Sequence, residues 1–137
     1  MKQSGAEFDY HRDLVALGRE KNFVVLTGAD TRLAEALSLG CTGCVSGIAD
    51  ALPNLMVSAY RAFKDADPAT IAATTAKVKA VGDLLDTLAF PLNIGALVEA
   101  SGLTAGEFKS AVCPATAARR TDLVAKLRRL IQDQHLE

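Results

Sequence analysis

The stretch Asn22–Pro53 constrains the fold of this chain more than any other, because strand-like and helix-like patterns alternate along it. It begins with a continuously apolar run, Phe23–Thr27, as expected of a parallel strand buried on both faces. A helical segment, Thr31–Leu39, follows, and Gly40 stands where a helix needs a residue with positive φ to end. A second apolar strand is expected over Cys44–Ile48. The pattern predicts a β-α-β-α unit with a right-handed crossover.

Capping residues mark the expected ends of the helices. Asp30 is placed to cap the helix after the first strand, and Pro53 stands in the first turn of a helix that reaches about Lys64. Asp67 and Pro68 are expected to be the N-cap and first residue of a longer helix. No strand pattern follows Asp67, so the rest of the chain is predicted to be helical. Its later helices are expected over Leu92–Ser101 and from Thr116 onward.

Another helix is expected before the first strand. Apolar side chains recur there at helical spacing, and Gly18 stands where this helix would end. The predicted apolar stripe consists of Phe8, Tyr10, Leu14 and Leu17. We expect His11, on the same segment, and His135 to be solvated, because neither has a Ser or Cys at a spacing that implies a catalytic triad.

Composition excludes several classes of partner. The 137 residues carry a net charge of −1 and no Trp, which argues against a nucleic-acid partner. No apolar run approaches the roughly 20 residues of a membrane span, and no signal-peptide pattern is present. Three cysteines, an odd number, indicate free thiols in a reducing compartment. We therefore expect one cytoplasmic globular protein with no membrane partner.

Two parallel strands are too few for a self-sufficient sheet. Independent stability usually needs three or more strands or extensive cover by helices, and both predicted strands are too apolar to be edges that face water. Either the helices wrap these strands, or strands from elsewhere complete the sheet. We expect the chain to form a homo-oligomer.

Several segments, in this order, resemble one family. Met1–Gly5 is similar to the end of the sixth barrel strand of the dihydrodipicolinate synthase and N-acetylneuraminate lyase family, the pyruvate-type class I aldolases. Phe23–Asp30 resembles the seventh strand with its exit loop, and Ala36–Gly47 resembles the approach into the eighth. Asp50 stands where the family usually has Asn. The segments after Asp67 resemble the family's C-terminal three-helix appendage.

The resemblance implies an α/β fold class, predominantly helical. The expected architecture is the C-terminal portion of a TIM (β/α)₈ barrel, with about two parallel strands and flanking helices, plus the helical appendage. Residues 1–66 would form the partial barrel, with the end of strand 6 and strands 7 and 8, and residues 67–137 the appendage. A whole barrel needs about 250 residues, so we expect this chain to be a C-terminal half.

The resemblance also implies a lyase or aldolase that acts on a 2-oxo acid such as pyruvate, through a lysine imine and with no metal or organic cofactor. Lys2 matches the position of the family's Schiff-base lysine. The family's carboxylate-binding loop and proton-relay tyrosine lie on earlier strands, and Tyr10 and Tyr60 match neither. We therefore expect the chain to be inactive alone. The alternative is a non-catalytic helical module that self-associates.

Small residues end both predicted strands. Thr27, Gly28, Ser46 and Gly47 lie on the side where the sites of barrels and open α/β sheets form. Their small size would let a substrate approach the backbone. The four are therefore candidate substrate-binding residues. Tight packing of a strand on a helix explains the same pattern equally well.

Cys41 and Cys44 form a Cys-Thr-Gly-Cys sequence, which makes a thiol redox protein a weaker alternative. A redox pair of the thioredoxin type would precede a helix, whereas this pair follows one. No second pair supplies zinc ligands. We expect Cys41 and Cys44 to be small apolar residues of the structure, and Cys113 to be a buried loop thiol.

Overall fold

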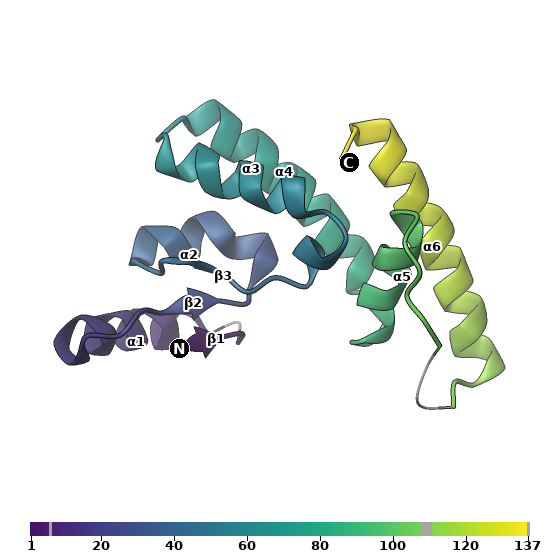
Figure 1. The fold of residues 1–137 in the computed structure, drawn as a ribbon, viewed down its shortest axis with the longest axis horizontal. Coiled ribbons are helices and arrows are strands. Elements are labelled where there is room, and N and C mark those ends of the chain that lie inside the picture. Colours follow the sequence, from purple (N-terminus) through teal and green to yellow (C-terminus); the bar gives the residue numbers. More distant parts are fainter. Residues whose placement is uncertain (6, 108–110, 137) are drawn as a thin grey trace.

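The computed structural model describes residues 1–5, 7–107 and 111–136. Within them, three short parallel strands are followed by helices, and a group of longer helices ends the chain (Figure 1). The strands are β1 (Lys2–Gln3), β2 (Leu26–Thr27) and β3 (Gly43–Cys44). The α-helices are α1 (Phe8–Lys21), α2 (Leu33–Leu39), α3 (Pro53–Lys64), α4 (Pro68–Leu85), α5 (Leu92–Ala100) and α6 (Pro114–Gln134). The 3₁₀ turns η1 (Asp30–Arg32) and η2 (Ile48–Asp50) precede α2 and α3.

The sheet has the order β1-β2-β3, and all its pairs are parallel. Lys2, Leu26 and Gly43 are in register across the three strands. Residues in register share a face, so Gln3, Thr27 and Cys44 lie on the opposite face. The periodicity had indicated two strands, and only the resemblance placed a strand end near the N-terminus.

The strands are shorter than the predicted runs 23–27 and 44–48, and they are not buried on both faces. Val25 is buried, but the exposed fraction of the Val24 side chain is 58% and that of Val45 is 46%. Helices cover only one face of the sheet, and successive side chains of an extended segment point to opposite faces. Val24 and Val45 therefore lie on the open face. Ile48, expected to end a strand, begins η2 instead.

The first helix continues past the expected end at Gly18. It runs to Lys21, and Asn22 ends it in the left-handed conformation, with φ of 56°. Gly18 is buried against the next segment, since a Cβ built there would lie 2.6 Å from the Phe23 carbonyl oxygen. The predicted apolar stripe was half wrong, because Tyr10 and Leu17 are exposed. The buried residues of α1 are Phe8, His11, Leu14, Val15 and Gly18.

Most of the predicted helix ends are confirmed. Gly40 ends α2 with φ of 107°, and Pro53 stands in the first turn of α3. Asp67 caps α4, where its carboxylate accepts a hydrogen bond from the Ala69 amide at 3.1 Å. The prediction that Asp30 caps the helix after the first strand is wrong. Asp30 begins η1, and its carboxylate accepts a hydrogen bond from the Ile48 amide, which follows β3.

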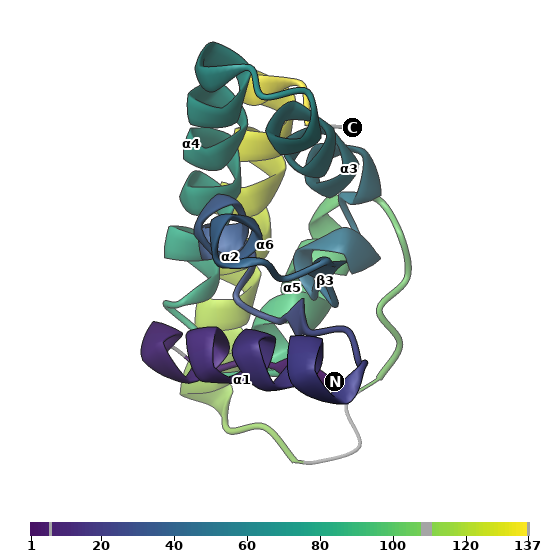
Figure 2. The same cartoon turned by 90° about the vertical axis from the view of Figure 1, so that its left-hand side faces the viewer.

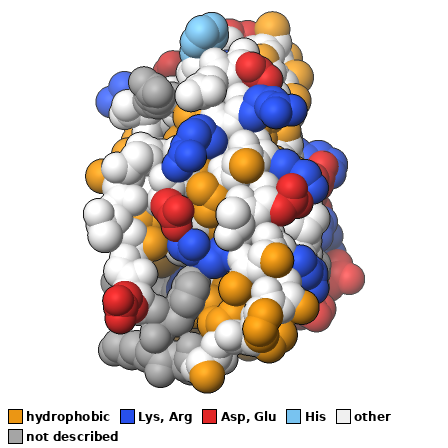
Figure 3. Space-filling view, turned by 90° about the vertical axis from the view of Figure 1, so that its right-hand side faces the viewer, with side chains coloured by type: hydrophobic (Ala, Val, Ile, Leu, Met, Phe, Trp, Pro, Cys, Tyr) orange, Lys and Arg blue, Asp and Glu red, His pale blue; other side chains and the backbone are white. Residues whose placement is uncertain are grey.

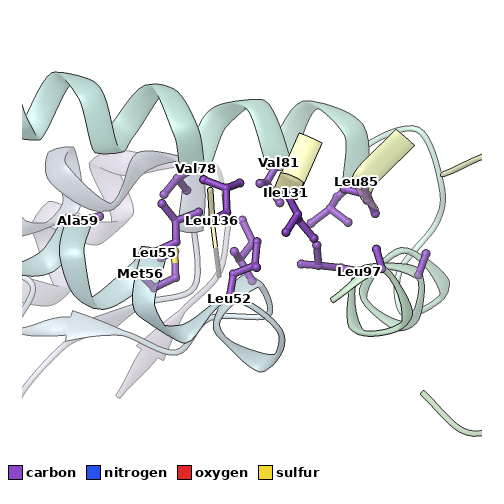
Figure 4. Close-up of a cluster of buried hydrophobic side chains, with 14 of the residues drawn as sticks. Leu52, Leu55, Met56, Ala59, Val78, Val81, Leu85, Leu97, Ile131 and Leu136 are labelled. Carbon is purple, nitrogen blue, oxygen red and sulfur yellow. The ribbon is translucent and has the colours of Figure 1, made fainter. Parts of the chain in front are cut away.

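Side chains from α2 to α6 form one large hydrophobic cluster (Figure 4). Leu55 and Met56 of α3 share it with Val78 and Val81 of α4, and Leu127 lies within it, fully buried. A smaller cluster lies between α1, the sheet and α2, and consists of Phe8, Leu14, Val15, Val25, Ala36 and Cys41. The division into residues 1–66 and 67–137 stays a prediction, since α3 and α4 pack in the same cluster.

The turned view shows how these layers stack. Helices α1 and α2 lie beside the sheet, while α4 and α6 stand upright, side by side, behind them (Figure 2). On the face over α6, Lys and Arg side chains alternate with Asp and Glu (Figure 3). Two ion pairs that involve α6 are Lys126–Asp122 and Arg120–Glu99, each at 2.7 Å. In the part of the chain that the structure describes, no helix is both long and apolar enough to cross a bilayer.

Candidate functional site

Lys2 begins the short strand β1, with an exposed side chain on the open face of the sheet. Its aliphatic stem crosses the residue after β2, since a Cβ built on Gly28 would lie 2.5 Å from Lys2 Cε and 2.5 Å from Ser4 Oγ. A residue with a side chain at position 28 would therefore displace the lysine. The side chain of the predicted residue Lys2 thus contacts the predicted residue Gly28, which directly follows β2.

Thr27 points to the other face of the sheet, away from Lys2. It is fully buried, and its Oγ1 accepts a hydrogen bond from the Ala29 amide at 3.0 Å. Its other partner is His11 Nε2, at 3.2 Å. The expectation of a solvated His11 is wrong, because this side chain is fully buried and stacks on Phe8, with ring centroids 4.5 Å apart. A histidine on the apolar face of an amphipathic helix packs as its neighbours do.

Asp30 ties the loops that follow β2 and β3. Its Oδ1 accepts a hydrogen bond from the Cys44 thiol at 3.2 Å, and its Oδ2 accepts one from the Ile48 amide at 3.1 Å. Burial raises the pKa of Cys44 to about 12, and the charge and hydrogen bond of Asp30 act in the same direction, while Lys2 acts against them. Asp30 and Lys2 therefore act on the Cys44 thiol with opposite sign.

The three thiols have different environments. Cys41 is buried, and burial raises its pKa. Cys113 is exposed, so the prediction of a buried loop thiol is wrong; the hydrogen bond with Thr116 lowers its pKa. A dithiol redox site needs a stabilised thiolate, whereas the environments of Cys41 and Cys44 stabilise the neutral thiols. In the described ranges, no group of three or more His, Cys, Asp or Glu side chains is placed to hold a metal ion.

Ser46 and Gly47 lie apart from Lys2, beyond β3. The Ser46 Oγ accepts a hydrogen bond from the Ala49 amide at 3.0 Å, which fixes the start of η2. Gly47 packs against α5, because a Cβ built on it would lie 2.9 Å from Ile94 Cδ1. At Gly47 the structure favours tight packing over open access.

Ser46 also lines an apolar groove of about 320 Å³ between β3 and α3. Tyr60 lies at its edge, where its hydroxyl donates a hydrogen bond to the Thr42 carbonyl oxygen at 3.5 Å. The apolar walls include Leu33, Ala49, Pro53, Met56 and Val57. The groove runs along the strand edge at which the described sheet ends.

His11 and Asp30 were both named from the sequence, but each was assigned the wrong role. The i, i+3 spacing of Phe8 and His11, continued by Leu14, would have indicated that the histidine faces the core. Asp30 carried no such signal, because its partners Cys44 and Ile48 lie 14 and 18 residues away.

The sequence of the chain matches one known protein family. Residues 1–130 match the model of the Dihydrodipicolinate synthetase family. Uncharacterized DapA-like lyases from two strains of Halobacterium salinarum are each 29% identical to the chain over 106 residues. The matched region is 74% of this chain and 35% of theirs, so the chain spans about a third of the length of these relatives.

Solved structures share the fold. YagE of E. coli K12, a prophage protein of the dihydrodipicolinic acid synthase family crystallised with pyruvate, superposes with a TM-score of 0.77 at 23% identity, over 99% of this chain and 46% of YagE. A monomeric dihydrodipicolinate synthase variant gives 0.80 at 20% identity, over 99% and 45%. N-acetylneuraminate lyase from Fusobacterium nucleatum, complexed with pyruvate, gives 0.72 at 12% identity, over 92% and 43%. The helical chain with its three-stranded parallel sheet is consistent with part of a TIM barrel.

Proposed function

Since this chain belongs to the dihydrodipicolinate synthetase family, we propose that it forms part of a lyase or aldolase that acts on a 2-oxo acid through an imine at Lys2. The observation that carries this proposal is the direction of the Lys2 side chain, which lies across Gly28, the residue at the carboxyl end of the parallel strand β2. Sites of barrel enzymes form at this end. Pyruvate in the crystals of YagE and of the F. nucleatum lyase supports a pyruvate-like substrate.

The chemistry assigned to Lys2 is the formation of a Schiff base. The unprotonated amine attacks the ketone carbon of the 2-oxo acid, and loss of one water from the resulting carbinolamine gives the imine. Such a lysine loses its proton near neutral pH only where burial or a neighbouring positive charge disfavours the ammonium form. On the open face, the Lys2 side chain is exposed to solvent. We therefore propose that the imine forms only when this face is covered.

The cover would come from the rest of a barrel. The chain spans less than half of the solved chains that share its fold, and by the family resemblance the carboxylate-binding loop and relay tyrosine belong to strands before β1. We propose that the described chain does not catalyse by itself. Residues 1–66 would supply the last barrel strands, and α4, α5 and α6, within 67–137, would form the helical appendage.

Substrate contacts are proposed for four residues. Gly28 contacts the Lys2 side chain, and the backbone of Thr27, which precedes it, pairs with Gln3, the residue after Lys2. Ser46 and Gly47 follow the neighbouring strand, and their backbone would reach the same end of a closed barrel. A Cβ at position 28 would displace the end of the Lys2 side chain and the Ser4 hydroxyl, so glycine at this position favours the observed position of Lys2.

The test is reductive trapping. The chain is incubated with pyruvate and borohydride, alone or mixed with the preceding barrel strands of a related synthase as a separate chain, and labelling is located by mass spectrometry. We expect negligible labelling alone and stoichiometric labelling at Lys2 in the mixture. Lys2→Ala abolishes it, whereas Lys126→Ala, at an exposed lysine on α6, leaves it unchanged.

Two results would contradict the proposal. Rapid stoichiometric trapping by the chain alone would show that the site is already assembled. Absence of trapping in a mixture shown to associate would refute the imine at Lys2. In that case the second candidate, a self-associating module without catalysis, would be favoured by the exposed apolar side chains of Val24 and Val45 on the open sheet face.

A further inference from the structure

A partly buried chain of hydrogen bonds runs from α1 to the loop that contacts Lys2. His11 Nδ1 lies 3.3 Å from the Glu7 carbonyl oxygen, and His11 Nε2 lies 3.2 Å from Thr27 Oγ1. Thr27 Oγ1 in turn accepts a hydrogen bond from the Ala29 amide at 3.0 Å. His11 and Thr27 are the two buried polar side chains of the described chain. Neither has a role in the imine chemistry proposed for Lys2.

The chemistry of the partners fixes the direction of each hydrogen bond. A carbonyl oxygen only accepts, so the contact with Glu7 is a hydrogen bond when His11 Nδ1 carries a proton and donates to that oxygen. In a neutral imidazole, Nε2 is then the acceptor, and the Thr27 hydroxyl donates to it. The Thr27 oxygen keeps its lone pairs for the Ala29 amide, which only donates. With this tautomer, every member of the chain is satisfied.

The opposite tautomer leaves two groups unsatisfied. A proton on His11 Nε2 would direct the lone pair of Nδ1 at the Glu7 carbonyl oxygen. The Thr27 hydroxyl would then accept from both His11 and Ala29, and its own proton would have no acceptor among its contacts. Buried polar groups without partners cost stability, so the first tautomer is favoured.

The imidazole ring is also held in place from its side. Phe8 stacks on it at an interplanar angle of 22°, and the Arg32 guanidinium lies over the Phe8 ring, 3.5 Å from its centroid. The ring therefore presents Nε2 to Thr27 in one orientation. A side chain whose rotation is restricted in this way can impose a direction on the hydroxyl that it contacts.

We propose that His11 is a positioning residue for the Lys2 site: it orients the Thr27 hydroxyl so that the oxygen holds the Ala29 amide and keeps Gly28 against Lys2. Gly28 lies between the two residues that this bond joins, and it contacts the lysine stem on the open face. The helix side of the sheet thereby fixes the backbone on which Lys2 lies. This positioning role of His11 affects catalysis through Lys2, and so it rests on the imine chemistry proposed for Lys2.

The first test is the tautomer of His11, measured by long-range ¹H–¹⁵N correlation on chain labelled at histidine. His135 is exposed and serves as the internal reference. We expect the proton of neutral His11 on Nδ1. Thr27→Val should shift the Nε2 resonance because the donor is lost, whereas Thr27→Ser should leave it near its original position. A proton on Nε2 in the unsubstituted chain would overturn the inference.

The second test follows the Ala29 amide by hydrogen exchange. His11→Leu removes the acceptor for the Thr27 hydroxyl, whereas His11→Gln places an amide oxygen near the former Nε2. We expect exchange of the Ala29 amide to be about fivefold faster in the Leu variant, the effect of one net hydrogen bond, and restored in the Gln variant. The Thr42 amide, bonded to the Val25 carbonyl oxygen at 2.9 Å, is the control in the same sheet.

Comparison of the exchange rates of the Ala29 and Thr42 amides distinguishes a positioning role of His11 from a packing role. If His11 only filled space, its replacement by Leu would accelerate exchange of Ala29 and Thr42 alike, or of neither, and either result would overturn the inference. Both readouts are independent of imine trapping. If the chain shows the expected tautomer and exchange pattern but is not trapped at Lys2 in a mixture shown to associate, the proposed function is refuted and the role of His11 in holding the loop remains.

Discussion

The environment of Cys44 leads to a quantitative prediction about thiol reactivity. Burial and the Asp30 carboxylate together raise the pKa of Cys44 from 9.0 to about 12. Each pKa unit changes the thiolate fraction tenfold, so below pH 9 Cys44 carries about a thousandfold less thiolate than an unperturbed cysteine. Because the thiolate is the nucleophile, alkylation should be slowed by at least that factor.

Alkylation with iodoacetamide between pH 7 and 9, followed by mass spectrometry of the peptides, measures this directly. Cys113 is exposed and has a lowered pKa, so it should react first. Cys41 should follow slowly, and Cys44 should be slowest. Asp30→Asn should accelerate Cys44, because it removes the carboxylate charge. Cys44 should nevertheless remain slower than Cys113, since burial is the largest cause of its raised pKa.

In concentrated guanidinium chloride the three thiols should react alike, which controls for local sequence. Alkylation of Cys44 in the folded chain at the rate of Cys113 would refute the reasoning.

The raised pKa of Cys44 also makes the free energy of unfolding depend on pH. The pKa of Cys44 is higher in the folded than in the unfolded chain, so its contribution is complete below about pH 9 and is lost as the pH rises from 9 towards 12. The denaturation midpoint should therefore fall in that range.

Two further predictions concern the core and the open face of the sheet. Leu127→Ala, at a fully buried position between the long helices, should lower the free energy of unfolding by about 2–5 kcal/mol in a urea titration. Leu103→Ala, at an exposed position, is the control and should change it by less than about 0.5 kcal/mol. Equal effects of the two substitutions would contradict the described core. The isolated chain should associate through its open face, so light scattering at micromolar concentration should give a mass above that of one chain. Replacing Val24 and Val45 together by Lys should shift the mass towards the monomer, and a compact monomer before substitution would contradict the prediction.

The helical part of the fold could be predicted because its signals are local. The caps at Asp67 and Gly40 and the first-turn Pro53 mark the ends of helices within a few residues of themselves, and the structure has them where they were expected. The strands could not be delimited in this way. Val24 and Val45 are as apolar as buried strand residues, but one face of the sheet is open, and hydropathy alone does not reveal which face lacks cover.

The candidate site shows the same limit. Lys2 was singled out by the family resemblance and Gly28 as a small residue at the end of a predicted strand, and the structure brings them together. Thr27 was also singled out, but its side chain faces α1. The hydrogen bonds that organise the region join His11 to Thr27 and Asp30 to Ile48, which are 16 and 18 residues apart. Such bonds depend on how a helix lies on the sheet, and periodicity within one segment does not contain that information.

The separation of the buried side chains into two clusters has a consequence for the energetics of opening. Among the described residues, the large cluster contains 19 side chains from α2 to α6, and the small one contains six, beneath β2 and α1. Regions with fewer buried apolar contacts open at lower free energy than the rest of a protein. The strands around Lys2 should therefore unfold locally while α3–α6 stay folded. Any molecule that covers the open face would raise the free energy of that local opening, so binding there and folding of the lysine-bearing segment are thermodynamically linked.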